Sequence, residues 1–366
     1  MICNLGQVDA YTTNCTPRGP NFHYMTITEY TAFYPSKPFW AKSAINVRGI
    51  DFNDEATSGW FFEQMSEVVF SFSNDLYEIK VCRDGQMMLR MEALEQSQTN
   101  RFEGAIDMRH WGNYLDYLNT FFLLFDSATH EFGLDHFNLH EITNRDIFRV
   151  RYEDGKVVGW NVSTQSIASV FQQGRFLSNY SSSPNIPIEN DLRISSTRRI
   201  VIELSIIEHT SVLFAQVVAA SGMEKTFASF AKSLSEYKIG NYSIALVLSW
   251  FIVEEVVSQL WKAHLGNLNR NITEGEARID SNRREFLIGR DIGLVVNLLE
   301  LWDVLPYPLF KQINIVRGYR NKIVHRKNFE LSNDEAELAI RTAHALIERI
   351  SGIRFVPNMG FPSPGL

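Results

Sequence analysis

The segment LLELWDVLPYPLFKQINIVRGYRNKIVH, Leu298–His325, predicts how the C-terminal half of the chain folds. Its apolar residues recur at three- and four-residue spacing, the period of an amphipathic helix, and we expect that helix over residues 308–326. The predicted core-facing stripe consists of Leu309, Ile313, Val316, Ile323 and Val324. Arg320 falls in the middle of this stripe. A charged guanidinium is costly there unless it meets an acid, lines a polar cleft or lies in an interface.

Polar residues accompany Arg320 at the end of this helix. Asn321 and His325 lie four residues apart at the edge of the stripe, with Arg317 behind them. In a structural interpretation, Arg320 forms an ion pair with Glu254 and His325 caps the helix end. In a catalytic interpretation, the same groups serve a ribonuclease that needs no metal. A base takes the proton of a ribose 2′-OH, a cation stabilises the phosphate oxygens, and a polar side chain orients both.

The same helix end is locally basic. The whole chain has a net charge of −7 and a pI near 5.8, which gives no global attraction to nucleic acid. The stretch RGYRNKIVHRK nevertheless contains cations and no acid. Such cations are also ordinary partners of a helix dipole. The candidates for phosphate contacts with RNA are Arg317, Lys322, Arg326 and Lys327.

Length and composition are those of a globular protein. The 366 residues allow two or three domains, and 45% hydrophobic with 21% charged residues is an ordinary balance. Cys3, Cys15 and Cys82 form no closely spaced pair, which argues against a zinc cluster or a disulfide framework. The start of the chain shows no secretory signal, and the most apolar run, Ile244–Val253, is too short to span a bilayer. We therefore expect a cytoplasmic protein with no membrane segment.

The N-terminal half predicts a mixed α and β domain. Alternating apolar residues on both sides of Asp84-Gly85, and again around Asp154-Gly155, indicate two antiparallel hairpins. Between the hairpins, helical spacing predicts an amphipathic helix packed on the sheet. Its apolar positions are Trp111, Leu115, Leu118, Phe122 and Phe125.

The C-terminal half predicts helices after a linker. Small polar residues and a proline interrupt every period in Ser178–Asn185. We expect long helices over Tyr242–Leu265 and Asp291–Trp302, and a last helix that opens with Ser332 and Glu335 in capping-box spacing. A further segment, residues 199–208, fits a strand as well as a helix, and the sequence does not decide between them.

These patterns give the fold class α+β. A mixed N-terminal domain with antiparallel hairpins, residues 1–182, precedes an all-α helical bundle, residues 183–356. The tail, residues 357–366, is rich in Pro and Gly, and its composition predicts disorder.

The helical half resembles the HEPN superfamily (higher eukaryotes and prokaryotes nucleotide-binding). RNKIVH, Arg320–His325, is similar to the R-x4-6-H motif of that family, in the form where a polar residue follows the arginine and the histidine closes the helix. GNYSIALVLSWFIVEEVVSQLW, Gly240–Trp261, resembles the long early helix with its embedded acid. Leu298–His325 resembles the approach to the motif helix in bacterial members. The likeness covers residues 226–354.

The resemblance implies a helical bundle that dimerises and brings two motifs together in one metal-independent ribonuclease site. By position, Arg320 and His325 would be catalytic, Asn321 the polar accessory and Glu254 the acid of the early helix. Many such proteins act in toxin–antitoxin or antiphage defence systems, with a neutralising or trigger protein as partner. The alternative is a non-catalytic HEPN-like module for dimerisation or nucleotide binding. For the N-terminal half, analogy supports only a role in sensing or in guiding substrate.

Other candidate sites are weaker. HEFGLDHFNLHE contains His130, His136 and His140 among acids, but Gly133 and the following strand favour a loop over a metal-binding helix. The glycine pairs form no phosphate-binding loop, and no GxSxG elbow marks a nucleophilic serine. We therefore predict neither a metal nor a cofactor.

Overall fold

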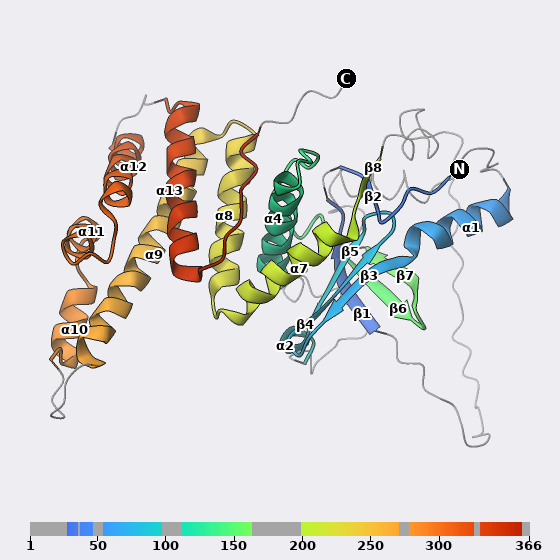
Figure 1. Cartoon of the computed structure of the whole chain (residues 1–366), viewed down its shortest axis with the longest axis horizontal. Helices are drawn as coiled ribbons and strands as arrows, with labels where there is room; N and C mark the ends of the chain where they lie inside the picture. Colours follow the sequence, from blue (N-terminus) through green and yellow to red (C-terminus); the bar gives the residue numbers. More distant parts are fainter. Residues whose placement is uncertain are drawn as a thin grey trace, which may run out of the picture.

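The computed structural model describes residues 28–35, 37–46, 54–96, 112–162, 199–270, 278–325 and 330–360. An antiparallel sheet from the N-terminal half stands at one end, and a layer of helices extends away from it (Figure 1). The α+β class predicted from the sequence is therefore confirmed.

The main sheet has six strands in the order β3-β4-β5-β1-β6-β7, and all neighbours run antiparallel. The strands are β1 (Thr28–Phe33), β3 (Val68–Ser73), β4 (Tyr77–Cys82), β5 (Met87–Met91), β6 (Phe148–Glu153) and β7 (Lys156–Val162). A small second sheet pairs β2 (Phe39–Ala41) in parallel with β8 (Ile200–Ile202). Residues 199–208 thus contribute both structures that the sequence left open, because β8 is followed by a helix that begins at Leu204.

Both predicted hairpins are present. β4 pairs with β5 through the turn at Asp84-Gly85, and β6 pairs with β7 through Asp154-Gly155. Asp154 and Gly155 have φ values of 48° and 83°, and a tight two-residue turn of the I′ type needs positive φ at both positions. The turn residues, which adopt positive φ easily, therefore favour the pairing of the strands on either side of them.

The described helices are α1 (Glu55–Ser66), α2 (Glu92–Gln96), α4 (Leu115–Glu131), α7 (Leu204–Ala219), α8 (Met223–Lys238), α9 (Tyr242–Arg270), α10 (Ser281–Ile288), α11 (Ile292–Leu301), α12 (Tyr307–His325) and α13 (Asn333–Ser351). The helices predicted for the C-terminal half are present as α9, α11, α12 and α13. The capping box of α13 is formed, with the Ser332 backbone N–H donating to Glu335 over 2.8 Å. Helices α4 and α7 lie next to the sheet, whereas α10, α11 and α12 lie at the far end (Figure 1).

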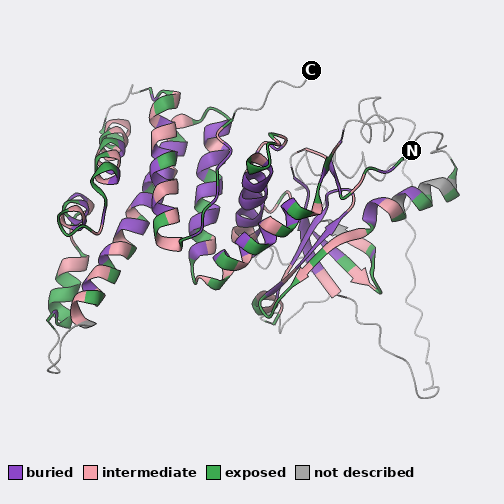
Figure 2. Cartoon of the chain, in the orientation of Figure 1, coloured by how far each residue is buried: buried purple, intermediate pink, exposed green. Residues whose placement is uncertain are grey.

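Helix α4 is buried on all sides, which differs from the predicted amphipathic helix. On the sheet side, the Phe122 ring lies 5.7 Å from that of Phe33. On the other side, the Phe121 ring lies 5.4 Å from that of Phe214 in α7. Figure 2 shows α4 as one of the most completely buried helices. The second apolar face, which the sequence assigned to solvent, is covered by the later helices α7 and α8.

One apolar core runs from the sheet through the helices. Because α4 belongs to this core, the described residues of the first predicted domain and those of the second pack together. The predicted linker, Ser178–Asn185, and the boundary at 182/183 lie outside the described residues. Part of the predicted tail is ordered by packing: Pro357 and Asn358 are buried. The prediction of disorder is therefore wrong for residues 357–360, and residues 361–366 lie outside the described part.

Helix α9 is the one described helix that is long and apolar enough to cross a membrane, over Tyr242–Asn269. It packs against α8, α13, α11 and α12. Its apolar residues Leu246, Val253 and Val257 are fully buried within the molecule. The packing is that of a core helix.

Candidate functional site

Helix α12 presents the motif at its C-terminal end. Leu309, Ile313 and Val316 are buried against the neighbouring helices, as the apolar stripe predicts. The stripe loosens toward the end of the helix, where Ile323 is half-buried and Val324 is 56% exposed. The prediction that Val324 faces the core is wrong, since more than half of its surface is exposed.

Arg320 and Asn321 are in contact. The Arg320 side chain is half-buried, and its Nη1 donates to Asn321 Oδ1 over 3.3 Å. His325 is exposed at the last residue of the helix. At about 100° per residue, Arg320 and His325 lie about 140° apart around the helix, whereas Asn321 and His325 lie about 40° apart. Asn321 therefore stands between the cation and the imidazole within one chain.

Glu254 has a partner other than Arg320. Its carboxylate accepts a hydrogen bond from the indole of Trp250 over 2.7 Å, one turn earlier in α9. Among the described residues, no ion pair within 4.0 Å joins Glu254 to Arg320. The expected structural ion pair is therefore corrected: within one chain, the half-buried guanidinium meets an amide and not this acid.

The predicted RNA contacts divide into three kinds. Arg317 is half-buried, and its guanidinium lies over Gly293 in the first turn of α11. The Lys322 Nζ lies 5.1 Å from the centre of the Tyr319 ring. Arg326 and Lys327 lie outside the described residues. Of the two described candidates, both are half-buried, and Lys322 lies next to the motif against Tyr319.

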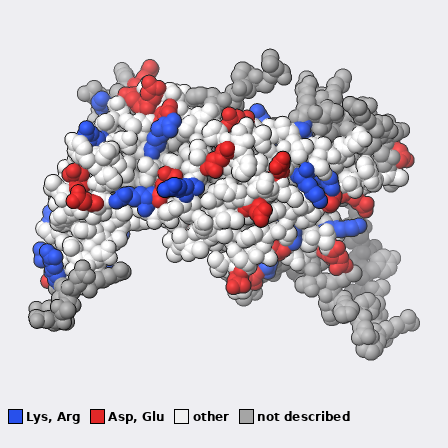
Figure 3. All heavy atoms as spheres, in the orientation of Figure 1, with Lys and Arg blue, Asp and Glu red and all other residues white. Residues whose placement is uncertain are grey.

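Charge and apolar surface alternate around the motif helix. Figure 3 shows Lys and Arg side chains interspersed with Asp and Glu over the face in view, without one large field of a single sign. On α12 itself, Tyr307, Ile315 and Val324 are 56%, 45% and 56% exposed. At about 100° per residue, Ile315 and Val324 lie about 180° apart around the helix, so these side chains are exposed singly and do not form one apolar patch.

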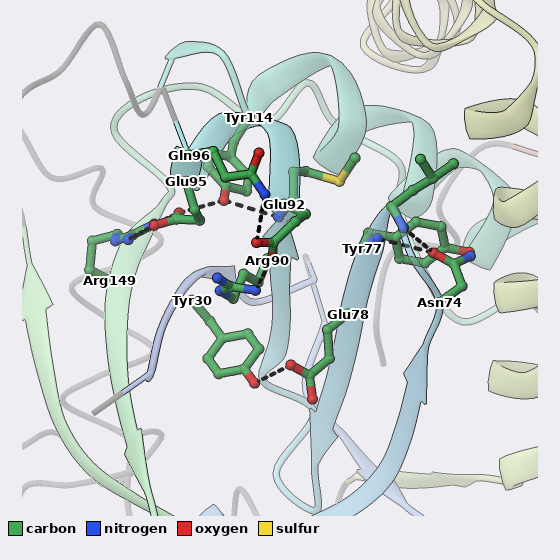
Figure 4. A network of polar contacts seen from close by, with 12 residues as sticks. Tyr30, Asn74, Tyr77, Glu78, Arg90, Glu92, Glu95, Gln96, Tyr114 and Arg149 are labelled. Atoms are coloured by element: carbon green, nitrogen blue, oxygen red, sulfur yellow. Dashed lines mark hydrogen bonds and ion pairs between the residues drawn. The ribbon is translucent and has the colours of Figure 1, made fainter. Parts of the chain in front are cut away.

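A buried polar network, which the sequence did not indicate, lies in the N-terminal half (Figure 4). The Glu95 carboxylate accepts from Arg149 over 3.1 and 3.2 Å and from the Tyr114 hydroxyl over 2.6 Å. Arg149 also donates to Thr31 and Glu29. Burial, with the Glu95 charge, raises the pKa of Tyr114. The network ties β1 and β6 to α2 and to the segment before α4, and we interpret it as structural.

A second buried charged pair joins α4 to α8. The Lys238 Nζ lies 3.5 Å from Asp126 Oδ2, and both side chains are 1% exposed. Burial raises the pKa of the Asp126 carboxyl from 3.8 to about 6, although Lys238 acts to lower it. Burial also lowers the pKa of Lys238. Helical spacing alone could not show this pair, because its partners are far apart in the sequence.

The histidines of the HEFGLDHFNLHE stretch point to different partners. His130 contacts Asp135, and His136 Nε2 lies 3.1 Å from the Pro38 carbonyl oxygen. His140 is largely buried, and burial lowers its pKa. Within the described residues, no group of three His, Cys, Asp or Glu side chains is placed to hold a metal ion.

Comparison with protein-family models, with curated proteins and with solved structures finds no match. The assignment of the site therefore rests on the motif residues and their geometry.

Proposed function

We propose that this chain is a metal-independent endoribonuclease of the HEPN type. The observation that carries the proposal is the arrangement at the end of α12, where the Arg320 guanidinium contacts Asn321 and an exposed His325 follows one turn later. A cation, a polar side chain and an imidazole are the groups that 2′-OH attack on the adjacent phosphate requires. No metal or cofactor enters this chemistry.

Each group has a role in the proposed reaction. Histidine is the side chain that exchanges a proton most readily near neutral pH, so His325 serves as general base for the 2′-OH. Arg320 stabilises the charge that develops on the phosphate oxygens, and Asn321 orients the guanidinium through its amide oxygen. As the bond between the 2′-oxygen and phosphorus forms, the bond from phosphorus to the 5′-oxygen breaks, and the leaving oxygen takes up a proton from water. The products are a 2′,3′-cyclic phosphate and a 5′-hydroxyl, with the 2′-OH proton on His325. Lys322 and, by sequence, Arg326 and Lys327 are the proposed phosphate contacts. Glu254 is an accessory residue that acts through Trp250.

A homodimer through the helical domain is part of the proposal. Because Arg320 and His325 lie about 140° apart on one helix, they do not face one phosphate from the same side. A second copy placed on the exposed part of α12 brings the histidine of one protomer toward the arginine of the other. The exposed Val324, about 40° from Arg320 around the helix, supplies apolar surface beside the motif for such a two-fold contact. Light scattering should give the mass of a dimer at micromolar concentration, and a monomer at every concentration would contradict it.

In the cell, we propose a toxin or antiphage role in the cytoplasm, controlled by a neutralising or trigger protein. The test of the activity uses purified protein, RNA and EDTA. We expect fragments that end in 2′,3′-cyclic phosphate, with a rate that the chelator leaves unchanged. Absence of cleavage, together with a stable dimer, would favour the non-catalytic dimerisation or nucleotide-binding module instead.

A further inference from the structure

Gly293 leaves room for the guanidinium of Arg317. A Cβ atom at position 293 would lie 1.7 Å from Arg317 Nη1 and 2.9 Å from its Cζ. The guanidinium therefore lies directly on the backbone of the first turn of α11. Any side chain at position 293 would occupy the same space, so this contact between α11 and α12 requires glycine.

Asp291 caps α11 beside this contact. It is the N-cap of α11, and its Oδ2 accepts from the backbone N–H of Gly293 over 2.9 Å. The same Oδ2 would lie 2.8 Å from a Cβ at Gly293, on the side where the guanidinium lies. A cation beside a helix N-terminus is disfavoured by the helix dipole, and a carboxylate in the first turn offsets that cost. The Asp291 carboxylate lies near the guanidinium, but among the described residues no ion pair within 4.0 Å joins the two, so the position of Arg317 depends directly on Gly293.

Arg317 is one helical turn before the motif. It lies three residues before Arg320 and four before Asn321, and such residues share a helix face. A contact that holds Arg317 on α11 also fixes the rotation and tilt of α12 where the Arg320–Asn321 pair begins. The last turn of α12 is largely exposed, so neighbouring helices hold it less firmly than they hold the earlier turns.

We infer that Gly293 and Arg317 form a clasp between α11 and α12, and that both are positioning residues for the motif. This inference rests on the proposed ribonuclease function. It gives Arg317 a different role from the phosphate contact that the sequence suggests. A phosphate contact depends on the positive charge of Arg317, whereas the clasp depends on the packing of its guanidinium against Gly293.

Gly293→Ala tests the clasp without removing a charge. The added methyl displaces the flexible end of Arg317, and alanine favours a helix more than glycine does, so the protein should remain folded. Gly318→Ala is the matched control, because a Cβ at this α12 position meets nothing within 4 Å. The set is completed by Arg317→Ala and by the double variant Gly293→Ala/Arg317→Ala.

For each variant, kcat, KM and the salt dependence of RNA binding are measured, together with urea unfolding. We expect Gly293→Ala and Arg317→Ala each to lower kcat about 10- to 100-fold, with KM and the salt dependence nearly unchanged. The double variant should be no slower than either single variant, because both remove the same contact. Gly318→Ala should retain the parental kcat.

Two results would overturn the inference. If Arg317→Ala raises KM and flattens the salt dependence while Gly293→Ala is as active as the parent, Arg317 contacts RNA. If the two kcat effects multiply in the double variant, the residues act independently. Should the parent cleave no RNA, the proposed function fails and the positioning role fails with it. The unfolding midpoints of the same four variants then still decide whether the contact exists, since only a shared contact gives non-additive shifts.

Discussion

Removal of the Lys238 charge should destabilise the protein strongly and in a pH-dependent way. In Lys238→Met, the buried Asp126 carboxylate loses the cation that lies 3.5 Å away. Loss of one partner from a buried pair costs about 3–5 kcal/mol, because the remaining charge is left without compensation. Burial raises the pKa of Asp126 from 3.8 to about 6 even with Lys238 beside it, so the carboxylate depends on this cation.

The sign of the pH dependence follows from the direction of this shift. Because the folded-state pKa of Asp126 lies above its ordinary value, the folded protein holds this proton more tightly than the unfolded chain does. The stability that protonation contributes is present at about pH 4 and is lost as the pH rises through about 6. Without Lys238, the carboxyl pKa rises further, since the cation that lowered it is gone. The loss in Lys238→Met should therefore be largest at pH 8 and smaller at pH 5.

Urea unfolding at pH 8 and pH 5 measures this prediction, with Lys232→Met as the control on the same helix. Lys232 pairs with Glu141 over 3.0 Å, but both side chains are substantially exposed, so its loss should cost at most about 1 kcal/mol. The double variant Asp126→Leu/Lys238→Met should recover most of the stability, because it buries no charge. An equal, small effect of both lysine substitutions at both pH values would refute the reasoning.

Two further substitutions test the other polar contacts. Arg149→Met should lower the free energy of unfolding by about 3–5 kcal/mol, because Glu95 then keeps a buried charge without its cation; a loss below 1 kcal/mol in urea unfolding would show that the network is open to water. Glu254→Gln retains an oxygen that accepts from Trp250, so its unfolding free energy should change by less than about 1 kcal/mol; a much larger loss in the same assay would indicate that the Glu254 charge itself is paired.

Local patterns of the sequence predicted the elements that local chemistry determines. The turn at Asp154-Gly155 has the positive φ angles that these two residues adopt most easily, and Glu335 caps α13 from the spacing that defines a capping box. The apolar stripe of α12 was correct over Leu309, Ile313 and Val316. These features depend on residues that are close in the sequence.

The features that the sequence did not predict depend on contacts between residues that are not adjacent in the sequence. Strand alternation places Arg149 on the face opposite Phe148, which the sequence would assign to solvent, yet both faces of β6 are buried over Phe148–Val150. Likewise, nothing near Arg317 in the sequence indicates that a glycine in α11 admits its guanidinium. The structural interpretation of the sequence paired Glu254 with Arg320, but its carboxylate accepts from the indole of Trp250. The sequence alone does not show which of these two donors the carboxylate contacts.

The rate of RNA cleavage by His325→Ala tests the central claim most directly. His325 is exposed at the end of α12, so its removal should leave the fold and the dimer intact. His209→Ala, at a partly exposed histidine in α7, is the matched control. If His325 is the general base, the substitution should slow cleavage by about 10²–10⁴-fold in EDTA, while the control cleaves at the parental rate. If His325→Ala cleaves RNA as fast as the parent, His325 is only a cap of the helix, and the assignment of ribonuclease activity to this motif is wrong.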